Sequence, residues 1–448
     1  MKKPVYAIFD VGKTNKKILL FDEQRQLLDE QQQVCLETTD DDGFPCETLE
    51  RLSYWVTSNW QQLRQHPYYQ LKGVNFTAYG ASFVHLGADG RPVAPLYNYL
   101  KPLPAAVAER FYAELGEDPA EFAAATCSPQ LGMLNSGLQL YWLKHAKPEL
   151  WAKVHTSLHL PQYLSYLITG EQYSDFTSVG CHTALWDFRR GDYHAWVRRE
   201  GLDQKLAPLL HDPVAAVVEG VLVGAGLHDS SAAILPYLGQ PIQPFLLVST
   251  GTWAVTFNPF SSQALTPELL RRDCLSYLGP TGQALPAARV FLGREHDHQV
   301  ARIANHFHIR TELRGDFYKS QAKVQPASPT AAPFRPWTMH GTGPFPEQPA
   351  EAWDLSGFRS AGEAYQHLLR GLVELLKTSI DLVRQGEQTI FVDGGFARNP
   401  LFLQLLSEAY PEAKVQTLEV PQATALGALL NLEGGMAQRP QPAAVALG

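Results

Sequence analysis

The chain has 448 residues, of which 45% are hydrophobic and 18% charged, so it holds enough apolar material for two large domains or three small ones. Its net charge of −8 lacks the basic surplus that nucleic-acid-binding proteins usually carry, and we therefore exclude that class. Five cysteines without CxxC spacing, no secretory signal pattern and no apolar stretch of about 18 residues together favour a reducing cytoplasm and no membrane span.

The first third of the chain is predicted to form a β-hairpin followed by a helix and a further strand. Apolar runs and helical spacing predict strands at 4–9, 18–21 and 71–78 and a helix at 46–66. A third strand is expected after the polar turn at 22–26. A second hairpin is predicted from residues 81–86 and 93–97, which flank the turn Ala88-Asp89-Gly90.

Helical spacing then continues to a domain boundary that we place near residue 240. Helices are expected at 103–116, 137–146 and 158–168, the last of them ending at Gly170. After a Pro- and Gly-rich stretch, strands at 245–249 and 253–257 enclose a turn of small residues. The second half therefore repeats the strand–turn–strand opening of the first half.

The last third contains the clearest helix of the chain, at 361–384, whose leucines recur at three- and four-residue spacing. It follows a Pro-, Ala- and Thr-rich loop at 325–350. A strand at 389–392 comes next, and Asp393-Gly394-Gly395 is expected to open another helix. We divide the chain into domains at 1–240 and 241–436, with a flexible tail at 437–448.

The segment 10–17, which follows the first strand, has the residues of a phosphate-binding turn. Gly12 allows a close backbone approach, Thr14 and Asn15 add a hydroxyl and an amide, and the N–H groups of the turn suit phosphate oxygens. Asp10 can hold hydrated Mg²⁺, which prefers carboxylate and phosphate oxygens. The GKT string suggests a P-loop, but that motif needs a glycine at a position where this chain has alanine. The alternative is a polar hairpin turn.

Asp229 lies in the turn Gly226-Leu227-His228-Asp229, directly before a run of small residues. A carboxylate at such a turn can act as the general base that accepts the proton of an attacking hydroxyl in phosphoryl transfer. The alternative is structural, because Asp is also a good N-cap before Ser-Ser-Ala-Ala. The two roles do not exclude each other.

Two further turns combine small residues with strand ends. Thr250, Gly251 and Thr252 form a turn between strands that suits phosphate, although many hairpins share this pattern. Gly394 and Gly395 follow a strand directly, so a flat ring or a sugar can lie against their backbone and a helix N-terminus would favour an anion. The alternative for both glycines is a tight turn without a ligand.

Four histidines, His296, His298, His306 and His308, raise the question of a metal site. The HxH spacing would place ligands on different faces of a helix, and no acidic or cysteine partner has suitable spacing. We therefore disfavour a zinc site.

Taken in this order, the motifs resemble those of the FGGY family of carbohydrate kinases, and the likeness spans nearly the whole chain. DxGxTxxK occupies 10–17, His228-Asp229 precedes a small-residue helix, STGT occupies 249–252, DGGxxxN occupies 393–399 and ATALGAL occupies 423–429. The resemblance implies an α/β fold of two ribonuclease-H-like lobes, as in actin-like ATPases, with an ATP cleft between them. The N-terminal lobe would bind the sugar, and the C-terminal lobe would bind most of the ATP.

The resemblance also implies roles for single residues. Asp229 is implied as the catalytic base, and Asp10 and Asp229 as the site of Mg²⁺. Contacts to ATP are implied for Gly12, Thr14, Asn15, Lys17, Thr250, Gly251, Thr252, Gly394, Gly395 and Asn399. Contacts to the sugar are implied for Tyr79, Ser82, Asn98, His228 and Asp229. Two sugar-binding patterns of family members, tryptophan–aspartate–arginine and GVD, are replaced here at 96–101 and 80–82, so the substrate stays open.

We therefore expect an ATP-dependent kinase that phosphorylates a hydroxyl of a ketose, with an L-fuculose- or L-rhamnulose-like sugar ahead of a xylulose-like one. One alternative is a kinase of the same fold for glycerol or another polyol. The other is an actin- or Hsp70-like ATPase that acts on a protein partner, which Asp229 disfavours because it lies where an acceptor would be activated. The oligomeric state stays open, with a homodimer among the alternatives.

Overall fold

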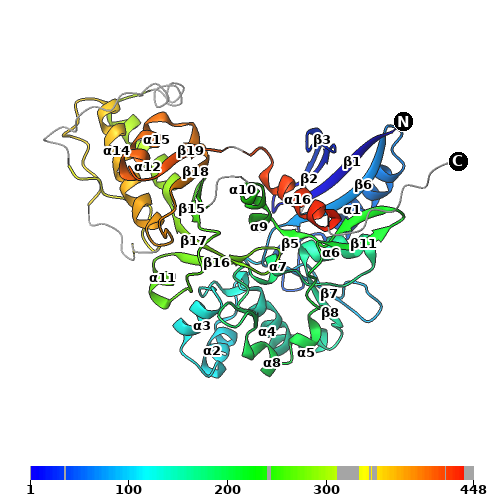
Figure 1. Cartoon of the computed structure of the whole chain (residues 1–448). Coiled ribbons are helices and arrows are strands. Elements are labelled where there is room, and N and C mark those ends of the chain that lie inside the picture. Colours follow the sequence, from blue (N-terminus) through cyan, green and yellow to red (C-terminus); the bar gives the residue numbers. More distant parts are fainter. Residues whose placement is uncertain are drawn as a thin grey trace. The chain divides into compact units, whose positions relative to one another are not determined.

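A computed structural model describes residues 2–34, 37–239, 244–309, 332–342, 345, 351–418 and 420–437 (Figure 1). The chain divides into two compact units. The first consists of Met1–Gly239, Tyr277–Ala284 and Gln422–Gly448, and the second of Gln240–Ser276 and Leu285–Pro421. Both units contain helices packed on a mixed sheet, so the predicted α/β class with two actin-like lobes is confirmed.

The sheet of the first unit is built on the hairpin that the sequence predicts. Its strands are β1 (Lys3–Val11), β2 (Asn15–Phe21), β3 (Leu27–Val34), β6 (Tyr69–Ala78), β11 (Val214–Val218), β12 (Val221–Gly224) and β13 (Leu227–His228). Their order is β11-β12-β6-β1-β2-β3, and β13 also pairs with β6. The first three strands are antiparallel neighbours, whereas β6 runs parallel to β1, β12 and β13.

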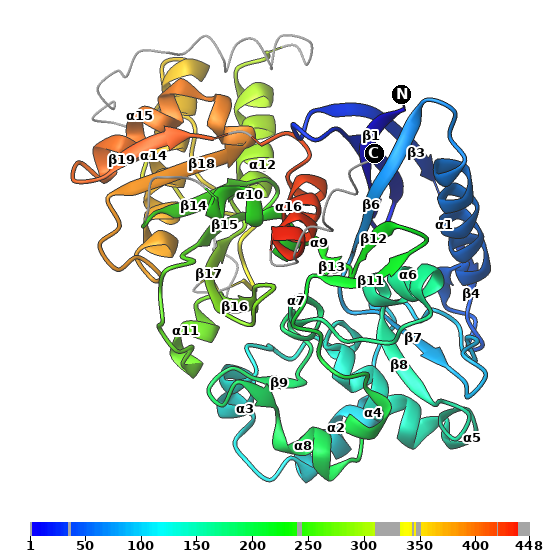
Figure 2. The ribbon, with the colours of Figure 1, turned by 45° about the vertical axis from the view of Figure 1, so that its right-hand side comes forward.

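Alternating residues of β1 fill two separate cores, one on each face of this sheet. Ala7 and Phe9 belong to a core shared with α1 (Leu49–Arg64) and α6 (Leu160–Thr169). Tyr6 and Ile8 belong to a core shared with α16 (Ala423–Ala437). Figure 2 shows α1 and α16 on opposite sides of the sheet.

The second unit repeats this strand arrangement, as the sequence predicts. Its strands are β14 (Leu246–Thr250), β15 (Ala254–Phe257), β16 (Cys274–Leu278), β17 (Ala284–Val290), β18 (Thr389–Gly394) and β19 (Lys414–Thr417), in the order β16-β17-β15-β14-β18-β19. As in the first unit, three antiparallel neighbours join two parallel strands, although here the third neighbour of the set is β17 and not the next strand in the chain, β16. Leu246 and Val248 of β14 pack into one core with α12 (Leu292–His306), α14 (Ala361–Ile380) and α15 (Pro400–Ala409).

Shorter elements complete the two units. In chain order they are β4 (Glu37–Thr39), β5 (Pro45–Glu47), β7 (Phe83–Leu86), α2 (Ala105–Glu114), α3 (Pro119–Ala125), η1 (Gly132–Leu134), α4 (Ser136–Ala146), α5 (Pro148–Trp151), β8 (Thr156–His159), α7 (Phe176–Val179), β9 (Trp186–Asp187), β10 (Asp192–Tyr193), α8 (Ala195–Arg199), η2 (Asp203–Lys205), α9 (Asp229–Ala233), α10 (Leu235–Leu238), α11 (Pro267–Arg271) and η4 (Gly395–Arg398). Within the described residues, every helix is too short or too polar to cross a membrane.

The predicted second hairpin is only partly confirmed. Its inner part forms, because the N–H of Gly87 donates to Arg91 O at 2.8 Å, the N–H of Val93 donates to His85 O at 2.9 Å, and an isolated bridge joins Leu86 and Pro92. The turn exists, with the N–H of Gly90 donating to the carbonyl of Gly87 at 3.0 Å, but β7 pairs with β8 about seventy residues downstream. Residues 93–97 form no strand and contribute a single bridge, from Leu96 to Glu47. Pro95 has no backbone N–H to donate to a sheet ladder, which limits a longer pairing of this segment.

Three other element boundaries differ from the sequence prediction. The segment 158–168 begins as β8 before α6 starts, and α6 ends at Gly170 in a left-handed conformation, as expected. The Gly394-Gly395 pair opens the short 3₁₀ turn η4, and α15 begins only at Pro400. Helix α16 belongs to the first unit, whereas the sequence analysis assigns it to the second domain. The predicted loop at 325–350 and the predicted tail fall mostly outside the described residues.

Candidate functional site

Three parallel strands of the first unit end at the same edge of its sheet. Asp10 on β1 lies beside Thr77 on β6, and Leu227 on β13 lies beside Thr77 from the other side. Asp10 therefore lies near the end of its strand, and Asp229 follows the end of β13 directly. Carboxyl ends of neighbouring parallel strands are where α/β proteins most often bind ligands.

The Asp10 side chain accepts a hydrogen bond from Thr77, and the nearby Asp229 affects its pKa. The hydroxyl of Thr77 donates to Asp10 Oδ1 at 2.9 Å. Burial raises the pKa of the Asp10 carboxyl, and the negative charge of Asp229 raises this pKa further, while the Thr77 bond lowers it. Burial, followed by Asp229, also raises the pKa of the Tyr99 hydroxyl. Asp229 is therefore close enough to influence the ionisation of the Asp10 carboxyl.

Asp229 is the first residue of α9, and the N-cap position belongs to His228. The carboxylate of Asp229 accepts hydrogen bonds from its neighbour Ser230, through the backbone N–H and through the hydroxyl at 3.1 Å. It also lies 3.3 Å from Nε2 of His228, and 30% of its side chain is exposed. Asp229 is thus one position later than the cap interpretation requires, and part of its carboxylate remains open to an acceptor.

A buried ion pair between Lys16 and Glu47 supports the turn between β1 and β2, and the sequence analysis missed it. The N–H of Gly12 donates to the carbonyl of Asn15 at 2.9 Å. Lys16 is fully buried and donates from Nζ to Gly12 O at 2.7 Å and to Glu47 at 3.1 Å. Tyr79 donates its hydroxyl to the same Glu47 carboxylate at 2.8 Å. A buried lysine needs such a partner, but Glu47 lies too far along the chain for spacing to reveal it.

The predicted phosphate residues of this turn differ in their surroundings. Thr14 is exposed at its tip, and Asn15 is half-buried. Lys17 pairs with Asp10 across the β1–β2 ladder and forms an ion pair with Glu30 at 2.8 Å. The Lys17 ammonium is therefore already neutralised by a carboxylate in this structure.

The predicted sugar residues do not form a single group. Tyr79 and His228 are buried beside the strand ends that carry Asp229. Ser82 is also buried, and its hydroxyl has no hydrogen-bond partner among the described residues. Asn98, in contrast, is used by its own loop, since its amide donates to Pro45 O at 3.0 Å and accepts from Leu100 N at 3.0 Å.

The second unit contains a pocket of about 320 Å³ at the equivalent strand ends. It is lined by Thr250, Gly251, Thr252, Gly293, His296, Asp297, Tyr365, Gly395, Phe396 and Asn399. Five of these are predicted ATP contacts, and Gly394 lies next to them in the chain. The other five, which come mostly from α12 and α14, were not predicted because they follow ordinary amphipathic helix patterns.

The two glycines after β18 have different reasons to be glycine. Gly394 has φ +85°, and a β-carbon there would overlap the carbonyl oxygen of Thr250. A β-carbon at Gly395 would meet its nearest atom only at 4.0 Å, so this position opens into the pocket. Thr250 itself is buried, donates to the carbonyl of Asp393 and accepts from Phe396 N at 3.0 Å. The Thr250 hydroxyl thus joins β14 to the turn after β18.

The rings of His296, Tyr365 and Phe396, which we call the aromatic wall, border the pocket. Asn399 donates to the hydroxyl of Tyr365 at 2.9 Å, and His296 Nε2 lies 3.3 Å from the same hydroxyl. The rings of His296 and Phe396 are 5.1 Å apart in an edge-to-face arrangement. Asn399 also caps α15 by accepting from Phe402 N at 3.1 Å. A flat heterocycle fits a pocket with such a wall and an open glycine.

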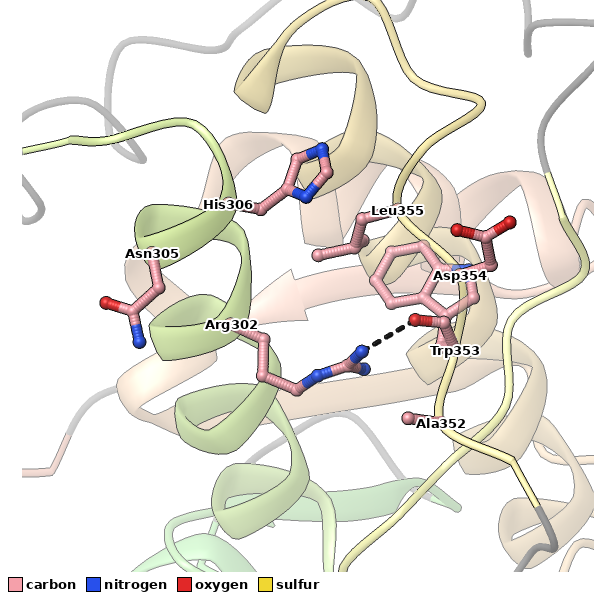
Figure 3. A pocket seen from close by; sticks show the side chains of 7 residues that line it. All are labelled: Arg302, Asn305, His306, Ala352, Trp353, Asp354 and Leu355. Atoms are coloured by element: carbon pink, nitrogen blue, oxygen red, sulfur yellow. Dashed lines mark hydrogen bonds between the residues drawn. The ribbon is translucent and has the colours of Figure 1, made fainter.

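The other histidines do not join His296. His306 lines a different pocket with Arg302 and residues 352–355, where Arg302 donates to Trp353 O at 2.7 Å (Figure 3). Among the described residues, the one group with metal-ligand geometry is Asp40, Asp41 and Asp42, which contains no histidine.

Two family models match this chain. "FGGY family of carbohydrate kinases, N-terminal domain" matches residues 5–200, and "Carbohydrate kinase FGGY, C-terminal domain" matches residues 242–441. The chain is 20% identical to a rhamnulokinase of Oceanobacillus iheyensis over 386 residues, which cover 81% of this chain and 78% of the relative. It is 22% identical to an L-fuculokinase of Haemophilus influenzae, with 96% and 95% covered. A solved carbohydrate kinase from Novosphingobium aromaticivorans matches with a TM-score of 0.79 and 28% identity over 98% of this chain and 93% of that one.

Proposed function

Since this chain belongs to the FGGY family of carbohydrate kinases, we propose that it transfers the γ-phosphoryl group of ATP to a hydroxyl of a ketose. The observation that carries the proposal is the placement of Asp10, Tyr79 and Asp229 at one sheet edge, beside the glycine turn 12–15. The relatives named rhamnulokinase and L-fuculokinase favour a deoxyketose of the L-rhamnulose or L-fuculose type ahead of a xylulose-like sugar.

In this proposal Asp229 is the general base. It accepts the proton of the attacking hydroxyl while the new oxygen–phosphorus bond forms and the bond from the γ-phosphorus to the leaving oxygen of ADP breaks. Its partly exposed carboxylate supports this role, because both hydrogen bonds from Ser230 go to Oδ1, which leaves Oδ2 for an acceptor. Tyr79, Ser82 and His228 are proposed to orient the sugar, and the bonds of Asn98 within its own loop make it the weakest of the predicted sugar contacts.

ATP is proposed to bind chiefly to the pocket of the second unit. The aromatic wall and Gly395 would take the adenosine, and the turn Thr250-Gly251-Thr252 would offer N–H groups to phosphate oxygens. Gly12, Thr14, Asn15 and Lys17 would contact the phosphates from the first unit. The prediction of a cleft between two lobes concerns how the units meet, and it stays a prediction.

The residues at the sheet edge fit the Mg²⁺ that accompanies ATP. Asp10 and Asp229 offer hard oxygen ligands, and the negative charge of Asp229 raises the pKa of the buried Asp10 carboxyl, an effect that a divalent cation would oppose. When bound, the cation would neutralise charge on the phosphoryl oxygens. The chain's own part is to keep Asp10 oriented through Thr77.

A coupled ADP-release assay with a panel of acceptors tests the proposal. We expect turnover with L-rhamnulose or L-fuculose to exceed turnover with D-xylulose, and turnover with glycerol to be lowest. A preference for glycerol would support the alternative that the chain is a glycerol or polyol kinase. ATP hydrolysis that no acceptor stimulates would favour the protein-binding ATPase alternative.

Cytoplasmic location and a homodimer also stay predictions. Light scattering on the purified full chain would measure the molar mass in solution, and a mass near twice 49.8 kDa would support the dimer.

A further inference from the structure

The strand that leads into Asp229 is too short to hold itself in place. β13 has two residues, Leu227 and His228, and its ladder partner is β6 on one side. The helix that follows, α9, has only five residues. A catalytic carboxylate at such a junction needs support from outside the sheet, because a displacement of about 1 Å can cost on the order of 10²-fold in rate.

The support comes from the N-terminus of α7. The hydroxyl of Thr177 accepts the backbone N–H of His228 at 2.9 Å. The same hydroxyl is within hydrogen-bond distance of Asp175 Oδ1, and this carboxylate also accepts from Thr177 N at 2.8 Å and from Ser178 N at 3.1 Å. All four residues are buried.

The direction of these bonds is fixed by chemistry. A hydroxyl has one proton, and a carboxylate takes it, so the oxygen of Thr177 is left with lone pairs that face the N–H of His228. Asp175 thereby orients Thr177, and Thr177 holds the main chain of the residue before Asp229. On its other side, the His228 ring contacts Cys181 Sγ and Ser231 Oγ, each at 3.2 Å.

We propose that Asp175 and Thr177 are positioning residues, which fix the Asp229 carboxylate for proton transfer by holding the His228 N–H. The inference rests on the proposed role of Asp229 as the base. Neither residue touches substrate in this account, so their loss should lower kcat and leave the KM for ATP unchanged.

Thr177→Val is the main variant, because it keeps the shape of the side chain and removes the acceptor. We expect kcat to fall on the order of tenfold or more, with the KM for ATP within about twofold of the parent. Thr177→Ser should restore kcat. Ser178→Ala is the matched control, since this neighbouring buried hydroxyl has no partner among the described residues and its loss should leave kcat unchanged.

A double-mutant cycle separates positioning from general loss of stability. If Asp175 acts through Thr177, Asp175→Asn should lower kcat in the parent and change it little in the Thr177→Val background. Equal effects of Asp175→Asn in both backgrounds, or a normal kcat in folded Thr177→Val, would overturn the inference. If Thr177→Val does not fold, Thr177→Cys replaces it, because sulfur is a poor acceptor of similar size.

Asp229→Asn, assayed in parallel, distinguishes the two levels of the argument. An active Asp229→Asn enzyme would refute the base itself and this inference with it. An inactive Asp229→Asn beside a fully active Thr177→Val would refute only the positioning role.

Discussion

Asp229 and Asp10 end neighbouring strands, yet their surroundings give them different tasks. Asp229 is partly exposed and contacts only its chain neighbours His228 and Ser230 among the described residues, whereas Asp10 is half-buried and held by Thr77. Asp229→Asn should keep the fold and nucleotide binding and lose about 10²–10⁴ in kcat, which is the usual contribution of a general base. Steady-state kinetics beside a thermal melt would check this. A near-normal rate would remove Asp229 from the mechanism, and failure to fold would instead support a structural role at the start of α9.

Asp10→Asn tests the charge of the second carboxylate without losing its shape. The amide oxygen can still accept from Thr77, so the strand ends should stay in place. We expect kcat to fall by at least about 10²-fold, because charge neutralisation at the phosphoryl group matters most in the transition state. Calorimetry should find nucleotide affinity little changed, since the proposed adenosine pocket belongs to the second unit. A normal kcat at every Mg²⁺ concentration would contradict the role.

Asp175 should leave a signature in the pH dependence of stability. Burial raises the pKa of its carboxyl from 3.8 to about 6, against the opposing effect of its hydrogen bonds from Thr177 and Ser178. The folded state thus binds this proton more tightly than the unfolded state. Its stabilising contribution is complete below about pH 4 and is lost as the pH rises through 6, a change on the order of 3 kcal/mol.

Urea unfolding of the parent and of Asp175→Asn between pH 4 and pH 7 would measure this. Relative to the variant, the parent should become less stable as the pH rises through this interval. Parallel pH profiles for the two proteins would show that the carboxyl of Asp175 does not titrate in this range.

At the scale of elements, the sequence predicts those parts of the site that local chemistry determines. Asp10 is recognisable because a carboxylate directly follows an apolar run, Asp229 because it lies in a glycine-led turn before small residues, and Gly395 because a glycine pair follows a strand. Contacts between distant segments are different. Glu47 meets Lys16 across 31 residues, and β7 finds β8 rather than its sequence neighbour. No spacing rule reports such pairs.

The turn after β18 offers a matched pair of substitutions. Gly395→Val should fold, because the β-carbon position is open, and should raise the KM for ATP on the order of tenfold by filling the pocket. Gly394→Ala should instead lower stability by at least about 1 kcal/mol, since its left-handed conformation and the nearby carbonyl of Thr250 exclude a side chain. Thermal melts and ATP titrations of both variants would check the contrast. An unchanged KM for ATP in folded Gly395→Val would contradict the adenosine assignment.

At the scale of the whole chain, the linear division at residue 240 misses how the first unit is completed. Helix α16, near the C-terminus, covers the face of the first sheet that carries Ile8 and Leu19. Asn75 on β6 donates to Ala428 O at 2.9 Å, and Arg25 forms an ion pair with Glu433 at 2.9 Å. Sequence patterns alone show α16 as an apolar helix and do not show which sheet it covers, because that depends on contacts across more than 350 residues.

Helix α16 also packs against α9, the helix that begins with Asp229. A substitution in α16 should therefore change the position of the Asp229 carboxylate. A β-carbon at Gly427 would overlap the carbonyl oxygen of Ala232 in α9, whereas a β-carbon at Gly434 in the same helix would meet nothing within 4 Å. Gly427→Ala should cost about 1–3 kcal/mol through overpacking and should lower kcat as α9 shifts. Gly434→Ala should stabilise the chain by up to about 1 kcal/mol, because alanine favours a helix, and should leave kcat unchanged. The two variants have the same composition, so a comparison of their melting temperatures and rates isolates the contact with α9. Equal melting temperatures and equal kcat values would mean that α16 does not support the helix of the catalytic base.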